Sequence, residues 1–574
     1  MNGFSPATHL LLVIATPLVG AVVAWVLGSR GLSAVRQSAA TTAVITLLSA
    51  GWLVLRYLAS PEAAAGEAYA VSAAPWLVGG MFDIRLSLGL DGLSIWLFGL
   101  SALLSLTAVL VSWEAVREKP VGFYVLLLLL EAAMLGVFAA RDVILFYTFF
   151  EFTLVPLFFL IGIWGHEDRR RAAVKFFVYT LAGSVLAFLG LLTIVLWNAS
   201  HTGTVTFDIA GLTAGLAAHP LPMDRQGGWL QLVVFLALFA GFAVKVPIVP
   251  FHTWLPLAHV EAPTGGSVDL AGVLLKIGIY GFLRFSLPML PDATALAAPW
   301  LFGLGVAGIL YGALVALVQT DLKRLIAYSS VSHMGYIVMG LFALEPVAVE
   351  GANLQLVNHG LSAAGLFALV GMIYERFHTR SIANLGGIAT KAPWLTVLFM
   401  LFTFSSIGLP GLNGFVGEFL ILAGSFQRAW TGVAGSYRTP YLVMAAAAVA
   451  GVVLGAWYML WAVERVFFGT TREPPRPATG HDHDHGHAEA AHATAADHCD
   501  LRWYETAALV PLAVLAVWIG LAPGAFLAPP AAVLRANTRA ASSAFAARML
   551  DADTRGPAAT TTHVAVAPAP RSSP

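Results

Sequence analysis

Runs of roughly twenty apolar residues recur about fourteen times along this sequence, and this repetition restricts the possible folds more than any other feature. A helix of about this length crosses the hydrocarbon core of a bilayer and satisfies its own backbone hydrogen bonds. Charged residues make up only 11% of the 574 residues, whereas soluble domains carry about 25%. We therefore expect an all-α polytopic membrane protein embedded in the lipid bilayer.

The loops between the expected spans differ in charge. The spans lie near residues 8–28, 39–58, 91–112, 121–140, 143–164, 173–197, 229–250, 265–290, 297–318, 323–343, 352–375, 394–426, 440–467 and 504–524. Loops rich in lysine and arginine follow spans one, three, five, nine and eleven, and such loops stay on the inner side of a membrane. We therefore expect both termini on the periplasmic side of a bacterial inner membrane, with the first span retained because no basic segment precedes it.

Composition also bears on partners and cofactors. The formal net charge is zero, which gives no indication of nucleic-acid binding. The single cysteine, Cys499, cannot form an internal disulfide and supplies too few thiolates for an iron–sulfur cluster. The sequence also lacks a glycine-rich nucleotide-binding loop, so we expect no cofactor in this chain.

Five ionisable residues lie inside apolar runs, where a charge is costly. They are Glu131, Glu151, Lys245, Lys276 and Glu418. Intramembrane charges usually face the interior of a bundle and mark ion pathways. The alternative is a set of salt bridges that only holds helices together. Two lysines and several acids in one chain favour an ion pathway.

Histidines add to this set. His333 and His359 each lie within an apolar run, and a histidine can pass a proton between its two ring nitrogens. A buried neutral imidazole bonded to a carbonyl is the alternative for both. His252 and His259 lie near the inner interface and fit ordinary boundary residues as well as functional ones.

Two of the runs are interrupted. "KVPIVPFH" breaks the seventh and "SSIGLPGLNGF" breaks the twelfth, which is too long for one straight span. Non-helical backbone at membrane depth survives only where protein or a water-filled cavity satisfies its polar groups. Paired interruptions indicate an inverted-repeat transporter, with spans four to eight and nine to thirteen as the five-helix repeats. Lys245 and Glu418 would then hold equivalent points.

The expected domain organisation follows from these features. It comprises helices 1–3 (1–120), a first repeat (121–290), a second repeat (291–470), a histidine-rich loop (471–503), and the last helix with the C-terminal tail (504–574). The loop contains "HDHDHGHAEAAHATAADHC", whose interchangeable ligands favour a mobile, dispensable segment over a structural metal site. The Ala-, Pro- and Thr-rich tail after about residue 530 is expected to be disordered at its end.

Several long motifs resemble one known family. "KVPIVPFHTWLPLAHVEAPTGGSVDLAGVLLK", "DLKRLIAYSSVSHMGYIVMG", "HGLSAAGLF" and "GLPGLNGFVGEF" are similar to the antiporter-like subunits of respiratory complex I. The likeness runs from about Asp91 to Phe468. The acid in the broken twelfth helix resembles the M type, or mitochondrial chain 4, because the L and N types and the Mrp antiporters typically carry lysine there.

The resemblance implies roles for individual residues. The positions that match the buried proton-transfer chain of the family are Glu151, Lys245, Lys276, His333, His359 and Glu418. A carboxylate near Lys245 would favour its charged form, and opening that pair would release a proton towards Lys276 and the second half. Leu257 departs from the family, which usually has aspartate there.

The resemblance also implies a function, a proton-translocating membrane subunit of NADH:quinone oxidoreductase. NADH, FMN, iron–sulfur clusters and quinone would then belong to partner subunits, and the L- and N-type subunits would be membrane neighbours. Three alternatives stay open at this point. They are an Mrp-type cation/proton antiporter subunit, a membrane-arm subunit of a membrane-bound hydrogenase, and a purely structural scaffold.

Overall fold

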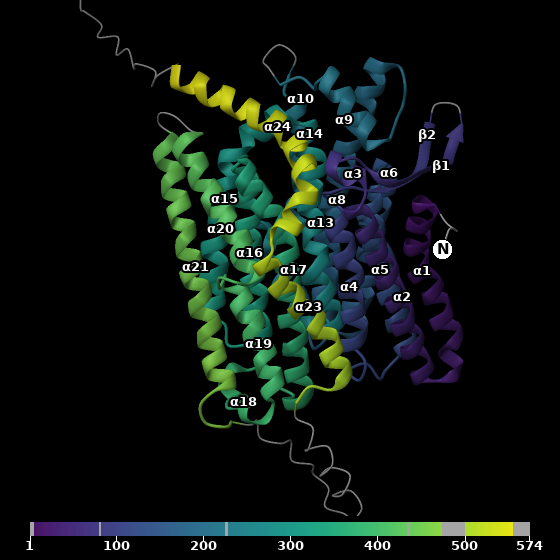
Figure 1. Cartoon of the computed structure of the whole chain (residues 1–574), viewed down its shortest axis with the longest axis vertical. Helices are drawn as coiled ribbons and strands as arrows, with labels where there is room; N and C mark the ends of the chain where they lie inside the picture. The colour runs from purple at the N-terminus through teal and green to yellow at the C-terminus, as the bar shows by residue number, and fades with distance from the viewer. Residues whose placement is uncertain (1–4, 80–81, 224–227, 433–436, 473–499, 555–574) are drawn as a thin grey trace, which may run out of the picture.

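The computed structural model describes residues 5–79, 82–223, 228–432, 437–472 and 500–554. These residues form a bundle of long helices whose axes are roughly parallel or antiparallel to one another (Figure 1). The N-terminal and central helices are α1 (Pro6–Val26), α2 (Leu32–Leu58), α3 (Pro61–Ala65), α4 (Ile95–Val111), α5 (Pro120–Ala139), α6 (Val143–Phe152), α7 (Leu154–Trp164), α8 (Arg169–Thr202), α9 (Ile209–Ala218), α10 (Leu230–Lys245), α11 (Leu255–Glu261), α12 (Thr264–Asp269), α13 (Leu275–Gly281) and α14 (Leu287–Met289).

The second half continues this pattern. Its helices are α15 (Pro291–Leu317), α16 (Leu322–Phe342), α17 (Pro346–Phe377), α18 (Ile388–Lys391), α19 (Pro393–Ser406), α20 (Asn413–Thr431), α21 (Arg438–Phe467), α23 (Trp503–Leu521) and α24 (Gly524–Thr554). Short 3-10 turns are η1 (Leu27–Arg30), η2 (Phe251–Trp254) and η5 (Ile382–Asn384), and π-helical turns are η3 (Leu270–Leu274) and η4 (Phe282–Ser286).

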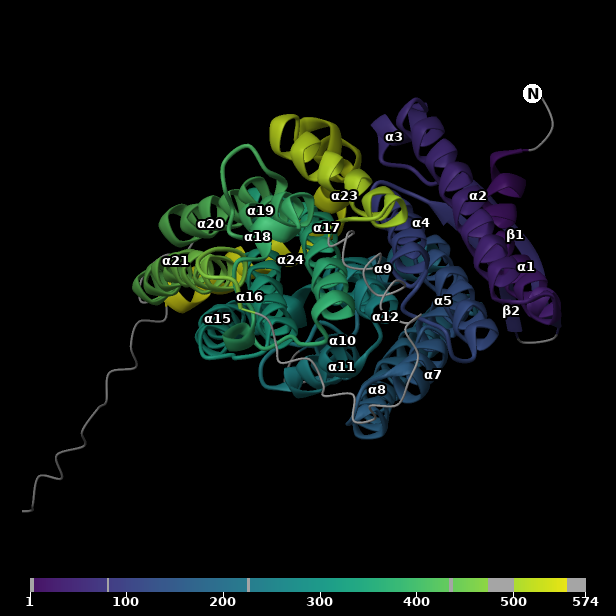
Figure 2. The same cartoon turned by 90° about the horizontal axis from the view of Figure 1, so that it is seen from below.

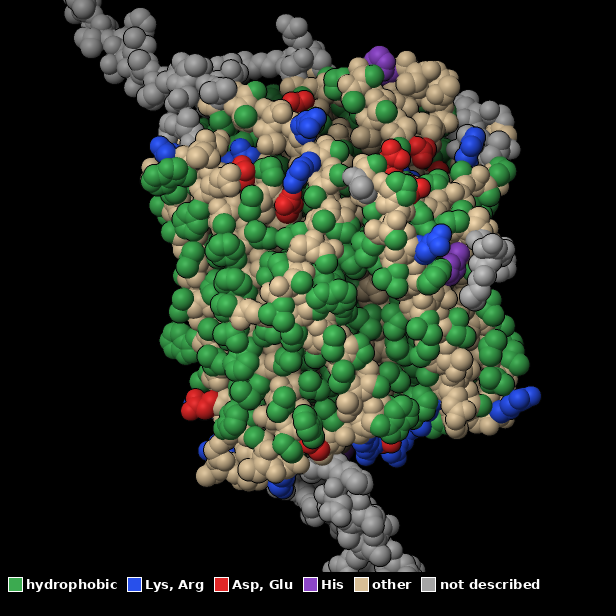
Figure 3. Space-filling view, viewed as in Figure 1, with side chains coloured by type: hydrophobic (Ala, Val, Ile, Leu, Met, Phe, Trp, Pro, Cys, Tyr) green, Lys and Arg blue, Asp and Glu red, His purple; other side chains and the backbone are tan. Residues whose placement is uncertain are grey.

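The expected membrane fold is confirmed at the level of class. In the described part of the chain, eleven helical segments are long and apolar enough to cross a membrane. The expected spans at 91–112, 229–250 and 394–426 coincide with shorter apolar helices, α4, α10 and α19. Figure 3 shows the consequence on one face, a belt of hydrophobic side chains with charged residues gathered above and below it. The chain is therefore a multi-pass membrane protein.

The sequence did not predict three elements. Strands β1 (Tyr69–Gly79) and β2 (Phe82–Leu90) form an antiparallel hairpin, and α9 is an additional short helix on the same side (Figure 1). Helix α24 continues through the tail after residue 530 as far as Thr554, and the prediction of disorder concerned only the end of the tail. Residues 555–574 and most of the histidine-rich loop, 473–499, lie outside the described residues.

Burial separates the central helices from the peripheral ones. The most apolar windows of α16 and α17 are 94% and 100% buried, whereas that of α21 is 28% buried and those of α1 and α2 are 39% buried. The view along the bundle agrees, with α16 and α17 inside and α1 and α2 at one end (Figure 2). Helices α12 and α13 belong to the central set, since their segment is also 94% buried. Ionisable side chains on these central helices therefore face protein and not lipid.

Both predicted helix breaks are present. Helix α10 ends at Lys245 and the chain resumes helical structure at η2, while α19 ends at Ser406 and α20 begins at Asn413. Lys245 precedes its break, whereas Glu418 follows its own, so the two residues lie at breaks but not at equivalent points. Side chains satisfy backbone groups that lack helical partners at the break. The Trp254 indole, for example, donates to the carbonyl of Val244 at 2.8 Å.

Candidate functional site

Lys276 and His359 form the first link of a buried polar row. Lys276 follows the π-helical turn η3, and its Nζ lies 2.9 Å from Nδ1 of His359 on α17. The same ammonium donates to the carbonyl of Ala271, which belongs to the π turn. Because π turns disturb the regular i to i+4 hydrogen-bond pattern, they make backbone carbonyls available to side chains and often occur at functional sites.

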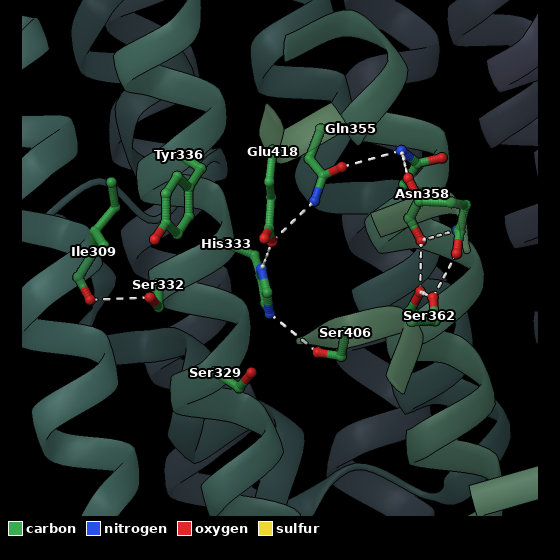
Figure 4. A network of polar contacts seen from close by, with 12 residues as sticks. Ile309, Ser329, Ser332, His333, Tyr336, Gln355, Asn358, Ser362, Ser406 and Glu418 are labelled. Atoms are coloured by element: carbon green, nitrogen blue, oxygen red, sulfur yellow. Dashed lines mark hydrogen bonds and ion pairs between the residues drawn. The ribbon is translucent and has the colours of Figure 1, made fainter. Parts of the chain in front are cut away.

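His333 on α16 forms the centre of the row. Its Nδ1 lies 3.1 Å from Oε1 of Glu418, and its Nε2 lies 3.1 Å from Oγ of Ser406 (Figure 4). The rings of His333 and His359 have their centroids 5.6 Å apart. An imidazole contacted at both nitrogens can accept a proton on one side and give it up on the other.

Glu418 lies near the start of α20, the helix that follows the break, and its side chain points towards His333. Its carboxylate also accepts from Nε2 of Gln355 at 3.4 Å (Figure 4). Gly408, in the break, has a φ of +73°, and a Cβ there would lie 2.8 Å from Oε2 of Glu418. Glycine at this position therefore allows both the left-handed turn and the close approach of the carboxylate.

A network of amides and hydroxyls holds the break in place. Nδ2 of Asn358 donates to the carbonyl of Asn413 at 2.8 Å and to Oε1 of Gln355 at 3.1 Å. In return, Nδ2 of Asn413 donates to the carbonyl of Asn358 at 3.2 Å. These bonds supply partners for non-helical backbone at membrane depth and connect the break to the helix that carries His359.

Lys245 has different partners from the one predicted. Its Nζ lies 3.2 Å from Oγ1 of Thr153 and 4.1 Å from the centroid of the Phe150 ring. Within the described residues, Glu151 and Lys245 form no ion pair at 4.0 Å or less, so Glu151 lies near Lys245 without a direct contact in this conformation. Phe150 and Thr153 are three residues apart and share the helix face towards Lys245, while Glu151 points about 100° away. The carboxylate still acts on Lys245 electrostatically.

Apolar side chains surround the small space beside Lys245. The small space beside Lys245 is lined by Leu154, Phe176, Trp254, Leu270 and Leu274. No hydrogen bond or ion pair joins the two lysines in the part of the chain that the structure describes. The site thus consists of a connected row, Lys276–His359–His333–Glu418, and a separate Lys245 centre with Glu151 nearby.

Comparison with known proteins places this arrangement in a family. The model for "NADH:quinone oxidoreductase/Mrp antiporter, TM" matches residues 140–437, which include all six residues of the predicted site. The chain belongs to this family.

Individual relatives and a solved structure agree with the family assignment. The chain is 40% identical to NADH-quinone oxidoreductase subunit M of Escherichia coli K12 over 467 residues, which cover 80% of this chain and 87% of the relative. It is 36% identical to NADH-ubiquinone oxidoreductase chain 4 of Chondrus crispus over 519 residues, 90% of this chain and 95% of the relative. A chain of respiratory complex I from Thermus thermophilus superimposes with a TM-score of 0.74 at 32% identity, covering 92% of this chain and 99% of that one.

Sequence reasoning left two buried groups undecided or unnoticed. His259 is 0% exposed and stacks on Phe367 with ring centroids 4.3 Å apart, so it is a core residue and not a boundary residue. Lys323, which the sequence analysis did not name, is buried and donates to the carbonyl of Ala262 at 2.6 Å. The signal for Lys323 was its place two residues after the N-cap aspartate Asp321, at the start of a buried helix. Leu257, which departs from the family pattern, is partly buried against the core.

An ionic site around Asp91 and Arg284 was also missed. Arg284 donates to both carboxylate oxygens of Asp91 at 2.7 and 2.8 Å, and Arg141 lies 3.6 Å away. Burial raises the pKa of Asp91, but the two guanidinium groups outweigh it and hold that pKa at about 2. This pair joins the segment before α4 to the π turn η4, and its bidentate geometry fits a structural role.

Proposed function

We propose that this chain is the proton-translocating M-type subunit of the membrane arm of NADH:quinone oxidoreductase. The observation that carries the proposal is the buried row Lys276–His359–His333–Glu418. Its Lys276–His359 and His333–Glu418 contacts are 2.9 and 3.1 Å long, and the centroids of the two imidazole rings lie 5.6 Å apart. Each member can bind and release a proton, and the row belongs to a chain whose relatives are named as subunits of that enzyme.

In the row, each residue has a distinct part. Lys276 holds a proton between the Ala271 carbonyl and His359, and His359 receives it on Nδ1. His333 carries it on to Glu418, which contacts its Nδ1. Glu418 is the terminal acid from which the proton leaves towards the outer side. Rotation of either imidazole or one intervening water would close the gap between the two rings.

Lys245 supplies protons to this row when its surroundings change. In the described conformation Thr153 and the Phe150 ring hold the ammonium, and apolar side chains that include Leu270 and Leu274 line the space beside it. Movement of Glu151 towards or away from Lys245 alters the charge that the lysine bears. An apolar barrier of this kind prevents leakage until water enters it, so coupling requires both the charge change and hydration.

The topology that supports this function has fourteen spans. We assign two inverted five-helix repeats, 121–290 and 291–470, after three N-terminal helices (1–120), with the loop 471–503 and the segment 504–574 completing the chain. Both termini lie in the periplasm of a bacterial cell with the subunit in its inner membrane. L- and N-type antiporter-like subunits are its neighbours, and NADH, FMN, iron–sulfur clusters and quinone bind to partner subunits.

An Mrp-type antiporter subunit is the second candidate, since the family model covers both kinds of protein. The acid at Glu418 favours the complex I assignment, because Mrp antiporters typically carry lysine at the matching position. A membrane-arm subunit of a membrane-bound hydrogenase is the third. The proteins that co-purify with this chain from its native membrane distinguish the three, as NADH dehydrogenase, Mrp or hydrogenase subunits.

The test of proton translocation uses Glu418→Gln in the assembled complex. Glutamine retains the size and the hydrogen bonding of the side chain but cannot ionise, so NADH-driven proton uptake into inverted membrane vesicles should fall by about two orders of magnitude. Glu418→Asp should retain part of the rate. Parental uptake in the glutamine variant, with normal assembly, would remove Glu418 from the route.

A further inference from the structure

Among the buried polar side chains outside the row that lack hydrogen-bond partners, three come from neighbouring helices. Ser105 lies on α4, Glu131 on α5 and Asp269 at the end of α12, with relative exposures of 3%, 0% and 0%. Among the described residues, Ser105 Oγ and all four carboxyl oxygens of the two acids have no partner. Unpaired buried polar groups are rare in native proteins and call for an explanation.

Helices α4 and α5 place Ser105 opposite Glu131. The hydroxyl of Tyr124 on α5 donates to the carbonyl of Ser112, just after α4, at 3.0 Å. The two helices run antiparallel from this contact. Ser105 lies seven residues before Ser112 in the sequence, and Glu131 lies seven residues after Tyr124, so both lie about two turns away from the contact in the same direction. The two side chains therefore lie at the same depth in the bundle.

The segment that carries Asp269 packs along the same stretch of α4. A Cβ on Gly265 would lie 2.5 Å from Oγ of Ser112, and one on Gly272 would lie 2.1 Å from Cδ1 of Leu104. Asp269 lies between these two glycines and thus beside the part of α4 that includes Ser105. The charge of Asp269 acts directly on Glu131, and neither acid belongs to an ion pair in the described part of the chain.

The π turn η3 explains why the side chains of Asp269 and Lys276 lie against different helices. Residues seven apart on a regular α-helix share a face. A π turn contains more residues per turn and rotates the following residues relative to the preceding ones. Lys276 accordingly meets His359 on α17, while Asp269 faces α4 and α5.

We propose that Glu131 and Asp269 form a carboxyl pair that shares one proton and takes up and releases a second one during turnover. Two bare carboxylates in a buried site without a cation repel each other, so the pair retains one proton between its members. Adding a proton converts the carboxylic acid–carboxylate pair, with one negative charge, into two neutral acids. The Ser105 hydroxyl can donate to the charged form. The proposal rests on the proposed function, which supplies the proton. It adds a site that holds a proton near the Lys276–His359 contact.

Infrared difference spectroscopy of the assembled complex, oxidised against NADH-reduced, tests this directly. The parent should show a deuterium-sensitive change in the carbonyl stretch of protonated carboxylic acids. Glu131→Gln and Asp269→Asn should each abolish the same component of that change, because the two groups share the proton. Ser105→Ala should shift the frequency of the band. Glu375→Gln is the control and should leave the band intact, since it neutralises another partly buried acid, on α17, whose Oε1 has no hydrogen bond.

Three results would overturn the pair. The first is a band that persists in both amide variants, and the second is its loss in only one of them, which would indicate a single acid. Glu131→Asp and Asp269→Glu retain a carboxyl group and should shift the band, so they serve if an amide variant does not assemble. Parental vesicles that pump protons but show no band would refute the pair while the proposed function stands.

Discussion

Nζ of Lys276 and Nδ1 of His359 lie 2.9 Å apart, and both side chains are buried. Two nitrogen atoms at this distance make a hydrogen bond only if one donates and the other accepts, so the pair holds a proton between them. Transfer of that proton to the imidazole allows the ring to pass charge on from its other nitrogen. This contact connects the π-helical turn of one half to the histidine–glutamate contact of the other.

The Thr153 hydroxyl should matter to coupling although it cannot carry charge. Thr153→Val removes the group 3.2 Å from Nζ of Lys245 and should lower NADH-driven proton uptake about tenfold, equivalent to about 1.4 kcal/mol. Thr153→Ser should restore most of the rate.

Lys245→Arg keeps the charge but cannot release a proton, so uptake should be lost with assembly intact. Full uptake by the arginine variant would exclude Lys245 as a proton carrier.

Asn413 should be required for the geometry of the break in the twelfth span. Asn413→Leu leaves the carbonyl of Asn358 without its 3.2 Å donor and should destabilise the subunit by about 1–3 kcal/mol. Thermal unfolding of the purified complex measures this. Asn384→Ala, at an exposed position in η5, is the matched control and should have no effect. An equal response to both substitutions would show that the network around Asn358 does not support the break.

The Asp91–Arg284 pair predicts a specific dependence of stability on pH. The folded-state pKa of Asp91 is about 2, below the ordinary 3.8, so its stabilisation is complete above the ordinary value and is lost as pH falls from about 4 to about 2. Asp91→Asn should therefore lower stability by about 2 kcal/mol at neutral pH. The gap between parent and variant, followed by thermal unfolding, should narrow below about pH 4. A gap that does not change down to pH 3 would contradict the assignment.

The histidine-rich segment should be dispensable. Deletion of residues 479–498 removes interchangeable ligands from a background of Ala, Gly and Thr that provides no core to orient a metal. Assembly and NADH-driven proton uptake should match the parent with chelator present or absent. Loss of coupling after the deletion would give this segment a function.

The sequence predicted those features that depend on local pattern. Apolar runs located the helices, and Pro and Gly located both breaks, because lipid permits few alternatives for backbone at membrane depth. The six site residues were identifiable as exceptions to an apolar background, together with the family resemblance. The structure brings four of them into one row.

Features that depend on helix rotation could not be predicted in this way. Glu151 was expected near Lys245, and the sequence did not show that its neighbours Phe150 and Thr153 make the direct contacts with the lysine. Asp269 was not named at all, because it lies at the end of a polar stretch, "APTGGSVD", and only packing shows that it is fully buried. The π turn that separates Asp269 from Lys276 has no recognisable sequence signature in this segment.

The central claim is that protons cross from Lys276 to Glu418 through the two histidines, and His359→Gln tests it most directly. Glutamine can accept and donate hydrogen bonds but does not bind a proton at neutral pH. His9→Gln, on α1 at the far end of the bundle, is the control. In inverted vesicles with matched amounts of assembled complex, His359→Gln should reduce NADH-driven proton uptake by about two orders of magnitude, and His9→Gln should not reduce it. Parental uptake in His359→Gln would contradict the account.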